Sequence, residues 1–254
     1  MNDLIRAGIK RMFRVKTLYV CLAVLFFIGG LDMIKESVFR EPGRSLPDPG
    51  GYLLSGFLAM VLLSAVFITS FLGDEHQYGT LRNKIAAGND KFRVYVSSFI
   101  VCHAAVMIMC GFVWLQTTLL GTLLLGGYTY TAKELLLLSL LSFSGFTMLT
   151  ALFVLIALCV QSKSIGSVAG VIAAFAIMIC GVMTVQVLSV PAFSPDYAGG
   201  SRRRLFEFIR LICPVSQMIS FSDGMGAESM LISLAGAAVL LASGMILFKN
   251  RDLR

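Results

Sequence analysis

The sequence predicts an all-α integral membrane protein that crosses the bilayer six times. Of its 254 residues, 57% are hydrophobic and only 14% are charged, whereas a soluble domain carries about 25% charged residues. The charges stand in short clusters between apolar runs, each long enough to cross a hydrocarbon core of about 30 Å as a helix. None of these runs alternates as a barrel strand does, so the helix is the structure that satisfies the backbone in lipid.

Six apolar runs are the predicted membrane spans. The first follows a basic segment but lacks a convincing cleavage site, so it is expected to stay as a permanent span. The third is longer than one crossing needs, which indicates a tilted or projecting helix. The runs are Thr17–Lys35, Tyr52–Gly73, Val94–Gly126, Glu134–Val160, Ile165–Val190 and Ser229–Phe248.

The distribution of Lys and Arg predicts that both termini are cytoplasmic. With the N-terminus inside, the inner segments hold 13 of the 21 basic residues and the outer segments hold the other 8. The positive-inside rule favours this orientation, and six crossings return the C-terminus to the same side. Anionic lipid of the inner leaflet then accounts for the net charge of +7 without a nucleic-acid partner.

The chain is expected to form a single transmembrane domain, 1–254, whose parts follow from these runs. An N-terminal helix over residues 3–14 has basic residues on one face and apolar residues on the other, the pattern of a helix in the headgroup plane. Its apolar face consists of Leu4, Ile5, Ile9, Met12 and Phe13. A basic flank that only sets topology is the alternative. The parts are 1–16 (interfacial helix), 17–73 (spans 1 and 2), 74–93 (cytoplasmic segment), 94–190 (spans 3 to 5), 191–228 (outer helical segment) and 229–254 (span 6 and tail).

The cytoplasmic segment 74–93 predicts a short helix between spans 2 and 3. Thr80 is expected to cap a helix over Leu81–Ala87, and Gly88 to end it in the left-handed conformation. Asp90 is expected to cap the third span.

Two side chains of this short helix suggest a contact with another protein. Leu81 and Ile85 are spaced as an exposed apolar pair, flanked by Arg82 and Lys84. A short helix with such a face can dock into a groove on a soluble partner. A connector that rests on the bilayer is an equal alternative.

The outer segment 191–228 predicts a second amphipathic helix. Ser201 is expected to cap a helix over Arg202–Cys213, which Pro214 breaks. Leu205 and Phe208 lie on its apolar face at helical spacing. Such a helix lies on the outer surface or dips into it, where it either gates a path or covers the bundle.

Two further features inside the spans are candidates for packing or transport. Gly166 and Gly170 form a small-xxx-small face, which lets helices approach closely, either within the chain or between protomers. His103 lies within the third span, where an ionisable side chain is a candidate pathway residue. A single interhelical hydrogen bond is the alternative role for a neutral histidine.

The six cysteines show no CxxC spacing, so they are expected to be small packing residues and no metal site is expected.

Several functional classes lack their sequence signatures. There is no GxxxxGK[ST], HExxH or GxSxG motif, so the chain carries no nucleotide-binding loop of its own and no catalytic residues are expected. The spans also lack the chain of carboxylates expected of a proton-coupled carrier. A path lined by apolar, Ser, Thr and Met side chains suits a hydrophobic or amphipathic cargo.

Several short motifs follow one another along the chain. Glu75 is followed by Gly79-Thr80-Leu81-Arg82, and Lys91-Phe92-Arg93 opens the long third span. In this order they resemble motifs of the type-2 ABC exporter permeases (the ABC-2 type). The C-terminal Phe248-Lys249-Asn250-Arg251-Asp252-Leu253 is similar to the closing motif of those permeases. The layout of the whole chain is similar too, and its size resembles the lantibiotic-immunity and antimicrobial-peptide export group.

The resemblance implies a permease subunit of a bacterial cytoplasmic-membrane exporter. Its partners would be a dimer of ATP-binding cassette subunits, which bind ATP and Mg, and a second permease subunit, identical or related. No cofactor is expected in this chain. The ATPase-coupling residues implied are Glu75, Gly79, Thr80, Leu81 and Arg82. An ATP-independent carrier or channel, a non-transporting anchor or sensor subunit, and an intramembrane enzyme are the alternatives.

Overall fold

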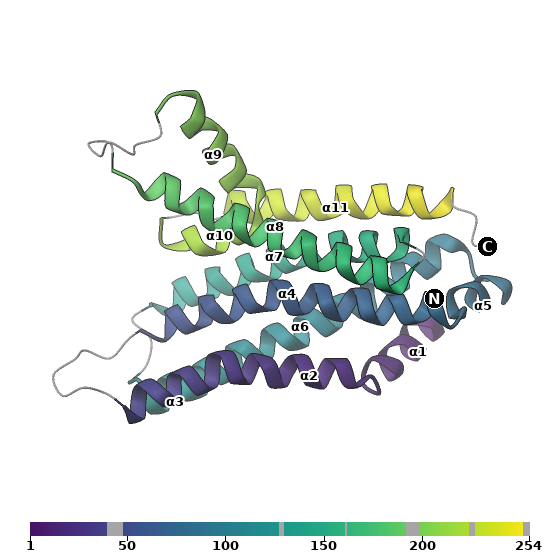
Figure 1. The fold of residues 1–254 in the computed structure, drawn as a ribbon, viewed down its shortest axis with the longest axis horizontal. Coiled ribbons are helices and arrows are strands. Elements are labelled where there is room, and N and C mark those ends of the chain that lie inside the picture. The colour runs from purple at the N-terminus through teal and green to yellow at the C-terminus, as the bar shows by residue number, and fades with distance from the viewer. Residues whose placement is uncertain (40–47, 127–129, 161, 192–198, 224–226, 251–254) are drawn as a thin grey trace.

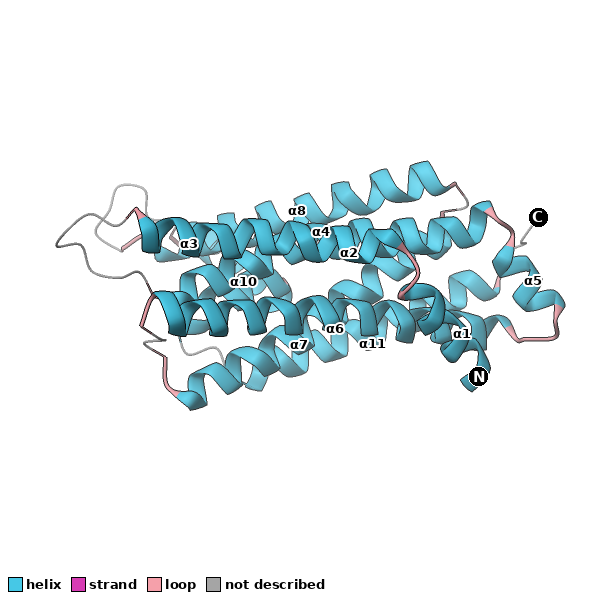
Figure 2. Ribbon diagram, turned by 90° about the horizontal axis from the view of Figure 1, so that it is seen from below, coloured by secondary structure: helices cyan, strands magenta, loops and turns pink. Residues whose placement is uncertain are grey.

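The computed structural model describes residues 1–39, 48–126, 130–160, 162–191, 199–223 and 227–250. These residues form a bundle of long helices joined by short loops (Figure 1). Within the described residues no strand is present, as Figure 2 shows. The predicted all-α fold is therefore confirmed.

Six helices of the bundle are long and apolar enough to span a membrane, as predicted. The structure begins and ends them within a few residues of the predicted runs. The longest, α6, has 34 residues and is about 51 Å long at 1.5 Å per residue. The first is a composite of α2 (Lys16–Leu25), a π-helical turn η1 (Phe26–Gly30) and α3 (Leu31–Val38). The others are α4 (Pro49–Gln77), α6 (Lys91–Leu124), α7 (Ala132–Cys159), α8 (Lys163–Ser189) and α11 (Ala227–Lys249).

Local sequence signals explain where two of these helices begin. Asp48 accepts a hydrogen bond from the Gly50 amide at 3.0 Å, and Pro49 occupies the first helical position of α4, where its missing N–H costs nothing. Thr131 and Glu134 form a reciprocal capping box at the start of α7. Both devices satisfy amide groups that a helix start otherwise leaves without partners.

The central helices of the bundle are α4 and α7, which are the most buried spans. The α8 helix packs against α4, and α11 packs against α7. Three spans meet around Phe57, whose ring lies 6.1 Å from Trp114 and 5.8 Å from Phe146. Most of the surfaces of α8 and α11 face outward, which suits helices in contact with lipid.

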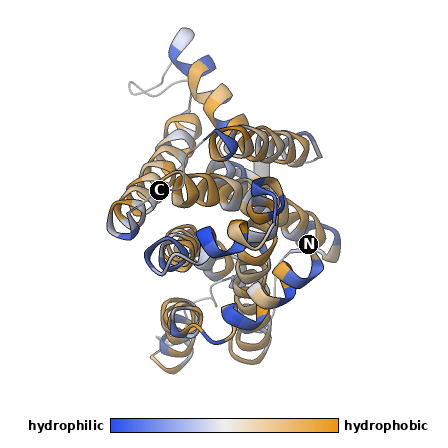
Figure 3. Ribbon diagram, turned by 90° about the vertical axis from the view of Figure 1, so that its right-hand side faces the viewer, coloured by the Kyte–Doolittle hydropathy of each residue, from blue (hydrophilic) through white to orange (hydrophobic). Residues whose placement is uncertain are grey.

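The two ends of the bundle carry different short helices. The N-terminus, α1 (Asn2–Met12), α5 (Thr80–Ala86) and the end of α11 lie at one end, here called the terminal end (Figure 1). At the opposite end lie α9 (Ser201–Ile212), α10 (Pro214–Ile219) and a 3-10 turn, η2 (Ser220–Asp223). Seen along the bundle (Figure 3), α9 projects sideways beyond the spans.

The α1 helix packs against α6. Most of its predicted apolar face takes part in this contact. Met12 is buried, and Leu4 and Ile9 pack against the core. A side chain at Gly8 would lie 2.6 Å from Val101, so this glycine permits the close approach. Phe13 belongs to the predicted apolar face but is exposed, because the helix ends at Met12 and the chain turns there.

The π-helical turn in the first span faces a polar side chain of α6. Gln116 is buried, and its Nε2 donates a hydrogen bond to the carbonyl oxygen of Leu25 at 3.2 Å. A Cβ at Gly29 would lie 2.5 Å from that nitrogen, so only glycine leaves room for the contact. A π turn leaves the regular α-helical hydrogen-bond pattern, and the glutamine bonds one of the carbonyls at its start.

A sharp corner joins α9 to α10 at Cys213 and Pro214, and α10 turns back into the bundle. The α10 helix packs against α7 and α8, and its residues Pro214–Met218 are buried. The break at Pro214 agrees with the prediction from the sequence, whereas the buried helix after it is an addition.

Side chains of α10 bond the backbone carbonyls that the corner leaves open. The Ser216 hydroxyl donates to the carbonyl of Arg210 at 3.0 Å, and Gln217 Nε2 donates to that of Leu211 at 2.6 Å. Ser233 of α11 donates to Gln217 Oε1 at 2.8 Å. These bonds satisfy carbonyl groups that the end of α9 leaves without intrahelical partners, and they fix the end of α9 to the bundle.

Two predicted helix caps are wrong, and a third is confirmed in its position but not in its hydrogen bond. Gly79, with φ of 65°, is the residue before α5, so Thr80 is its first helical residue, and the Thr80 hydroxyl donates to the Glu75 carbonyl at 3.1 Å. Gly200 rather than Ser201 precedes α9. Asp90 does precede α6, but its side chain accepts no capping hydrogen bond. Gly88 ends α5 with a φ of 86°, as predicted.

Candidate functional site

A buried carboxylate near the end of α4 joins three helices at the terminal end. Only 2% of the Glu75 side chain is exposed. Its Oε1 accepts hydrogen bonds from Arg11 Nη1 of α1 and Lys84 Nζ of α5, both at 2.7 Å. Because charge-assisted bonds are among the strongest in proteins, this cluster ties the two short helices to a membrane span.

Arg11 makes two further contacts with α4 that hold its guanidinium in place. Its Nη2 donates to the carbonyl oxygen of Phe71 at 3.0 Å. The guanidinium also lies over the Phe71 ring, 4.6 Å from its centre, at a distance that permits a cation–π contact. Arg11 therefore contacts a carboxylate, a carbonyl and an aromatic ring in the last turns of one helix.

The neighbouring carboxylate, Asp74, joins α4 to a fourth helix. Lys163, the first residue of α8, lies 2.7 Å from Asp74 Oδ1. This pair is more exposed than the Glu75 cluster, with 41% of the lysine side chain and 25% of the aspartate side chain accessible. One turn of α4 thus carries two acidic residues that contact α1, α5 and α8.

The α5 helix is held against the bundle by Leu81, which is 2% exposed. The prediction of an exposed apolar pair is therefore wrong for Leu81, because this short helix turns its leucine toward the spans. Ile85 is half-buried and packs against the same core. Leu81 anchors the helix and is closed to a partner.

The outward side of α5 carries a shallow recess of about 540 Å³. Arg82, Asn83 and Ala86 are exposed there, and 71% of Tyr78 is exposed. The lining mixes polar and apolar groups: Tyr78, Gly79, Arg82, Asn83, Ile85, Ala86 and Lys91. We call this surface the α5 recess.

The structure divides the five predicted coupling residues into two groups. Glu75 and Leu81 face inward and hold α5 in place, whereas Gly79 and Arg82 line the α5 recess. Thr80 belongs to the first group, because its hydroxyl bonds the end of α4. The sequence does not single out Tyr78 and Asn83, which also line the α5 recess. Helical spacing could have indicated Asn83, because a helix that turns Leu81 inward turns residues 82, 83 and 86 outward.

The two glycines of the small-xxx-small motif are not equivalent. A Cβ at Gly170 would lie 2.5 Å from Thr69 Cγ2 of α4, so α8 crosses α4 at this glycine. A Cβ at Gly166 would meet only Val160, at 3.7 Å, an ordinary contact distance. The packing role within the chain belongs to Gly170, and packing between protomers stays a prediction.

His103 lies among aromatic rings rather than in a polar channel. Its ring stacks on Phe99 of α6 at 5.6 Å and meets the edge of Phe143 of α7 at 5.6 Å. These contacts explain how a histidine is accommodated within a span. A pathway role for His103 stays a prediction.

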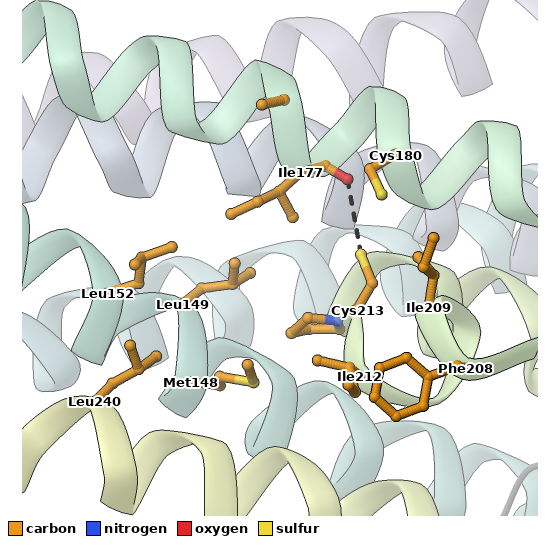
Figure 4. A pocket seen from close by; sticks show the side chains of 12 residues that line it. Met148, Leu149, Leu152, Ile177, Cys180, Phe208, Ile209, Ile212, Cys213 and Leu240 are labelled. Atoms are coloured by element: carbon orange, nitrogen blue, oxygen red, sulfur yellow. Dashed lines mark hydrogen bonds between the residues drawn. The ribbon is translucent and has the colours of Figure 1, made fainter. Parts of the chain in front are cut away.

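An apolar groove of about 480 Å³ opens between α8 and α11 (Figure 4). The α7 helix packs against both and lies between them, while α9 closes one end. The lining residues are Met148, Leu149, Leu152, Ala176, Ile177, Cys180, Phe208, Ile209, Ile212, Cys213, Pro214 and Leu240. None carries a charge, and we call this the α8–α11 groove.

The two cysteines of the groove differ from those of the core. The Cys213 thiol donates to the carbonyl of Ile177 at 3.7 Å (Figure 4), whereas Cys180 is exposed. Cys21, Cys102 and Cys110 are buried, as expected of packing residues. The expectation that every cysteine packs in the interior is wrong for Cys180, because that part of α8 faces away from the core.

Comparison with known proteins adds no family assignment. No protein-family model matches this chain, and no curated protein matches its sequence.

Proposed function

We propose that the chain is the membrane-spanning permease subunit of an ATP-driven exporter of the ABC-2 type, in the cytoplasmic membrane of a bacterium. The observation that carries the proposal is the buried Glu75 cluster, which ties α5 to α1 and to the end of α4. In this proposal the terminal end, with both termini, faces the cytoplasm.

The Glu75 cluster can transmit a displacement of α5 to the membrane spans. A load applied to α5 reaches α4 through Lys84 and Glu75, and reaches α1 through Arg11. Leu81 adds an apolar anchor between α5 and the spans. A helix joined in this way moves together with a span, which is what coupling to a separate motor requires.

The α5 recess is the proposed contact with that motor. Tyr78, Arg82 and Asn83 offer an aromatic ring, a guanidinium and an amide to a soluble protein, side chains that suit a protein interface. The partner would be a dimer of ATP-binding cassette subunits that binds ATP and Mg. A second permease subunit, identical or related, would complete the transporter.

The proposed cargo is hydrophobic or amphipathic: a peptide such as a bacteriocin, a drug or a lipid. The α8–α11 groove supports this class, because it has the volume and apolar lining of a small-molecule site. None of its lining side chains carries an oxygen atom, which is the ligand that hard metal ions prefer. The groove lies on the sides of α8 and α11 that the bundle leaves uncovered, so a cargo can enter it from the membrane.

The test is reconstitution with an ATP-binding cassette subunit, taken from the genes that adjoin the gene of this chain. The two proteins are co-expressed, purified and placed in vesicles, and ATP hydrolysis and export of a fluorescent amphipathic peptide are measured. Arg82→Glu and Tyr78→Ala are expected to weaken binding of the ATPase and to uncouple hydrolysis from export. Lys133→Glu, an exposed charge change at the opposite end of the bundle, is the matched control and is expected to leave both unchanged.

Other outcomes assign a different function. Failure to co-purify with any ATP-binding protein contradicts the proposal. Transport that follows an ion gradient without ATP identifies a carrier or channel. A stable complex without flux of any tested compound identifies an anchor or sensor subunit. Leu81→Asp is unsuitable as a coupling variant, since burying a carboxylate there unfolds α5 from the bundle.

A further inference from the structure

A recess lies on the outward side of α1, at the terminal end of the bundle. It has a volume of about 300 Å³ and is separate from the α5 recess. Its lining residues all come from α1: Asn2, Ile5, Arg6, Ile9 and Lys10. We call it the α1 recess.

The α1 recess combines an apolar floor with a basic rim. Ile5 and Ile9 are half-buried, whereas Arg6 and Lys10 are exposed and lie one turn apart on the same face of the helix. Asp3, the acidic residue of α1, is not among the lining residues. Two cations above an apolar surface complement the phosphate and the upper acyl region of a phospholipid, and a guanidinium suits phosphate geometry in particular.

The position of α1 along α6 places the recess near the edge of the hydrocarbon core. The α6 helix is about 51 Å long, which exceeds a core of about 30 Å by about 20 Å. Its Lys and Arg residues, Lys91 and Arg93, both lie at the terminal end, so the excess length projects there. The α1 helix meets α6 at Val101, about 15 Å along α6 from Lys91. It therefore lies beside α6 close to the membrane boundary and not at the projecting tip.

The connection from α1 to the first span has the side chains of a membrane interface. Phe13 is 48% exposed and Tyr19 is 54% exposed, and the Tyr19 hydroxyl donates to the carbonyl oxygen of Phe13 at 2.9 Å. Arg14 and Lys16 are exposed on the same connection. Aromatic rings are enriched where a protein crosses the boundary between lipid and water. The exposed position of Phe13 therefore suits a ring that enters lipid.

The opposite face of α1 reaches the Glu75 cluster. Arg11 follows Lys10 in the chain but points inward, where it bonds Glu75 Oε1 and the carbonyl oxygen of Phe71. These two bonds fix the direction of the carboxylate, and Lys84 of α5 bonds the same oxygen. The α1 helix thus presents basic side chains outward and orients the carboxylate that holds α5.

We propose that the α1 recess binds the phosphate group of an anionic phospholipid, through Arg6 and Lys10, and that this contact stabilises α5 through the Glu75 cluster. A lipid suits the recess better than a dissolved anion, because the floor is apolar and Phe13 is exposed at the same membrane boundary. A lipid that holds α1 in place keeps Arg11 on the carboxylate, so α5 opens less often. The inference requires a membrane protein but not ATP-driven transport, so the two proposals fail separately.

The test is hydrogen exchange of the full-length protein in nanodiscs, measured by mass spectrometry. Nanodiscs of phosphatidylcholine alone are compared with nanodiscs that also contain phosphatidylglycerol. Their two faces are alike, so the result does not depend on the orientation of the protein. With phosphatidylglycerol, exchange is expected to slow at least about fivefold in α1 and at least about threefold in α5, because an opening of α1 then breaks contacts with an anionic surface. Exchange in α7 is expected to stay unchanged.

Two double variants with the same change in charge test the recess. Arg6→Gln with Lys10→Gln is expected to abolish the response of both helices to phosphatidylglycerol. Both residues are exposed, so this variant is expected to fold normally. Arg202→Gln with Arg204→Gln changes exposed residues of α9 and is expected to keep the full response. Equal losses in the two variants, or a full response without Arg6 and Lys10, would overturn the site.

Lys84→Gln tests the connection from α1 to α5. It removes the bond between α5 and Glu75 and leaves that of Arg11 in place. Phosphatidylglycerol is then expected to slow exchange in α1 but no longer in α5. A response of α5 that persists in this variant, or that is absent from the unchanged protein, overturns the role of the Glu75 cluster.

Inorganic phosphate distinguishes the two sources of the anion. Added to phosphatidylcholine nanodiscs, it is expected to leave exchange in α1 unchanged. Slowing equal to that caused by phosphatidylglycerol, and lost with Arg6 and Lys10, would replace the lipid with a dissolved phosphate and overturn that part of the proposal.

Discussion

Arg11 and Glu75 are 64 positions apart in the chain, yet the arginine donates a 2.7 Å hydrogen bond to the carboxylate. Arg11 belongs to the short α1 helix and Glu75 to the end of a central span. With Lys84 on the same oxygen, the pair turns three separate helices at the terminal end into one connected unit.

Replacing Glu75 with glutamine is expected to destabilise the protein by about 2–3 kcal/mol, because two cations lose a nearly buried charge partner. The measurement is the thermal unfolding midpoint in detergent. Asp74→Asn is the matched control. Its partner Lys163 is 41% exposed, so a loss below about 1 kcal/mol is expected. Equal effects of the two variants would show that burial of Glu75 contributes nothing.

Gly170→Ala is expected to destabilise the packing of α8 on α4 by about 1–3 kcal/mol, since the added carbon would meet Thr69 Cγ2. Gly166→Ala is expected to have little effect, because its nearest neighbour lies at 3.7 Å. Unfolding midpoints of the two variants test the difference. Adding Thr69→Ser to Gly170→Ala removes the atom in conflict and is expected to restore most of the loss. Failure of this rescue would contradict the proposed close crossing.

Gln116→Leu is expected to destabilise the protein by about 0.6–1.7 kcal/mol, the range of hydrogen bonds between membrane helices. The substitution keeps a similar volume and removes the bond to the carbonyl of Leu25. Hydrogen exchange over residues 26–31 is expected to become faster, while exchange in α7 stays unchanged. Unchanged exchange in the first span would mean that the π-helical turn does not depend on Gln116.

Cys180 is expected to react with a membrane-permeant maleimide much faster than Cys102, because Cys180 is exposed on the α8–α11 groove and Cys102 is fully buried. Mass spectrometry of peptides after timed labelling gives both rates in one sample. A hydrophobic cargo bound in the groove is expected to slow labelling of Cys180. Labelling that no tested amphiphile slows would count against the groove as a cargo site.

The sequence predicts the spans well, because a run of about 20 apolar residues has one stable structure in lipid. It also locates α5 and α9, where Gly88 and Pro214 mark their ends. These features depend on local composition, so they can be found without knowing which helices are neighbours.

The contacts of the candidate site depend on which helices are neighbours. The inward direction of Leu81 follows from how a seven-residue helix lies on the bundle, which spacing alone does not determine. The partners of Glu75 come from two other helices. The buried α10 helix had one overlooked signal, the polar pair Ser216-Gln217 within an apolar segment, which bonds the corner before it.

The π-helical turn at Phe26–Gly30 has a consequence for how the gene tolerates changes in length. A π turn contains one residue more than an α turn, so removing one residue from this turn would leave a continuous α-helix with Leu31–Val38 in nearly the same orientation. The same deletion elsewhere in the span would rotate everything after it by about 100°. The turn is therefore the place in the first span where we expect natural relatives of different length to place an alignment gap.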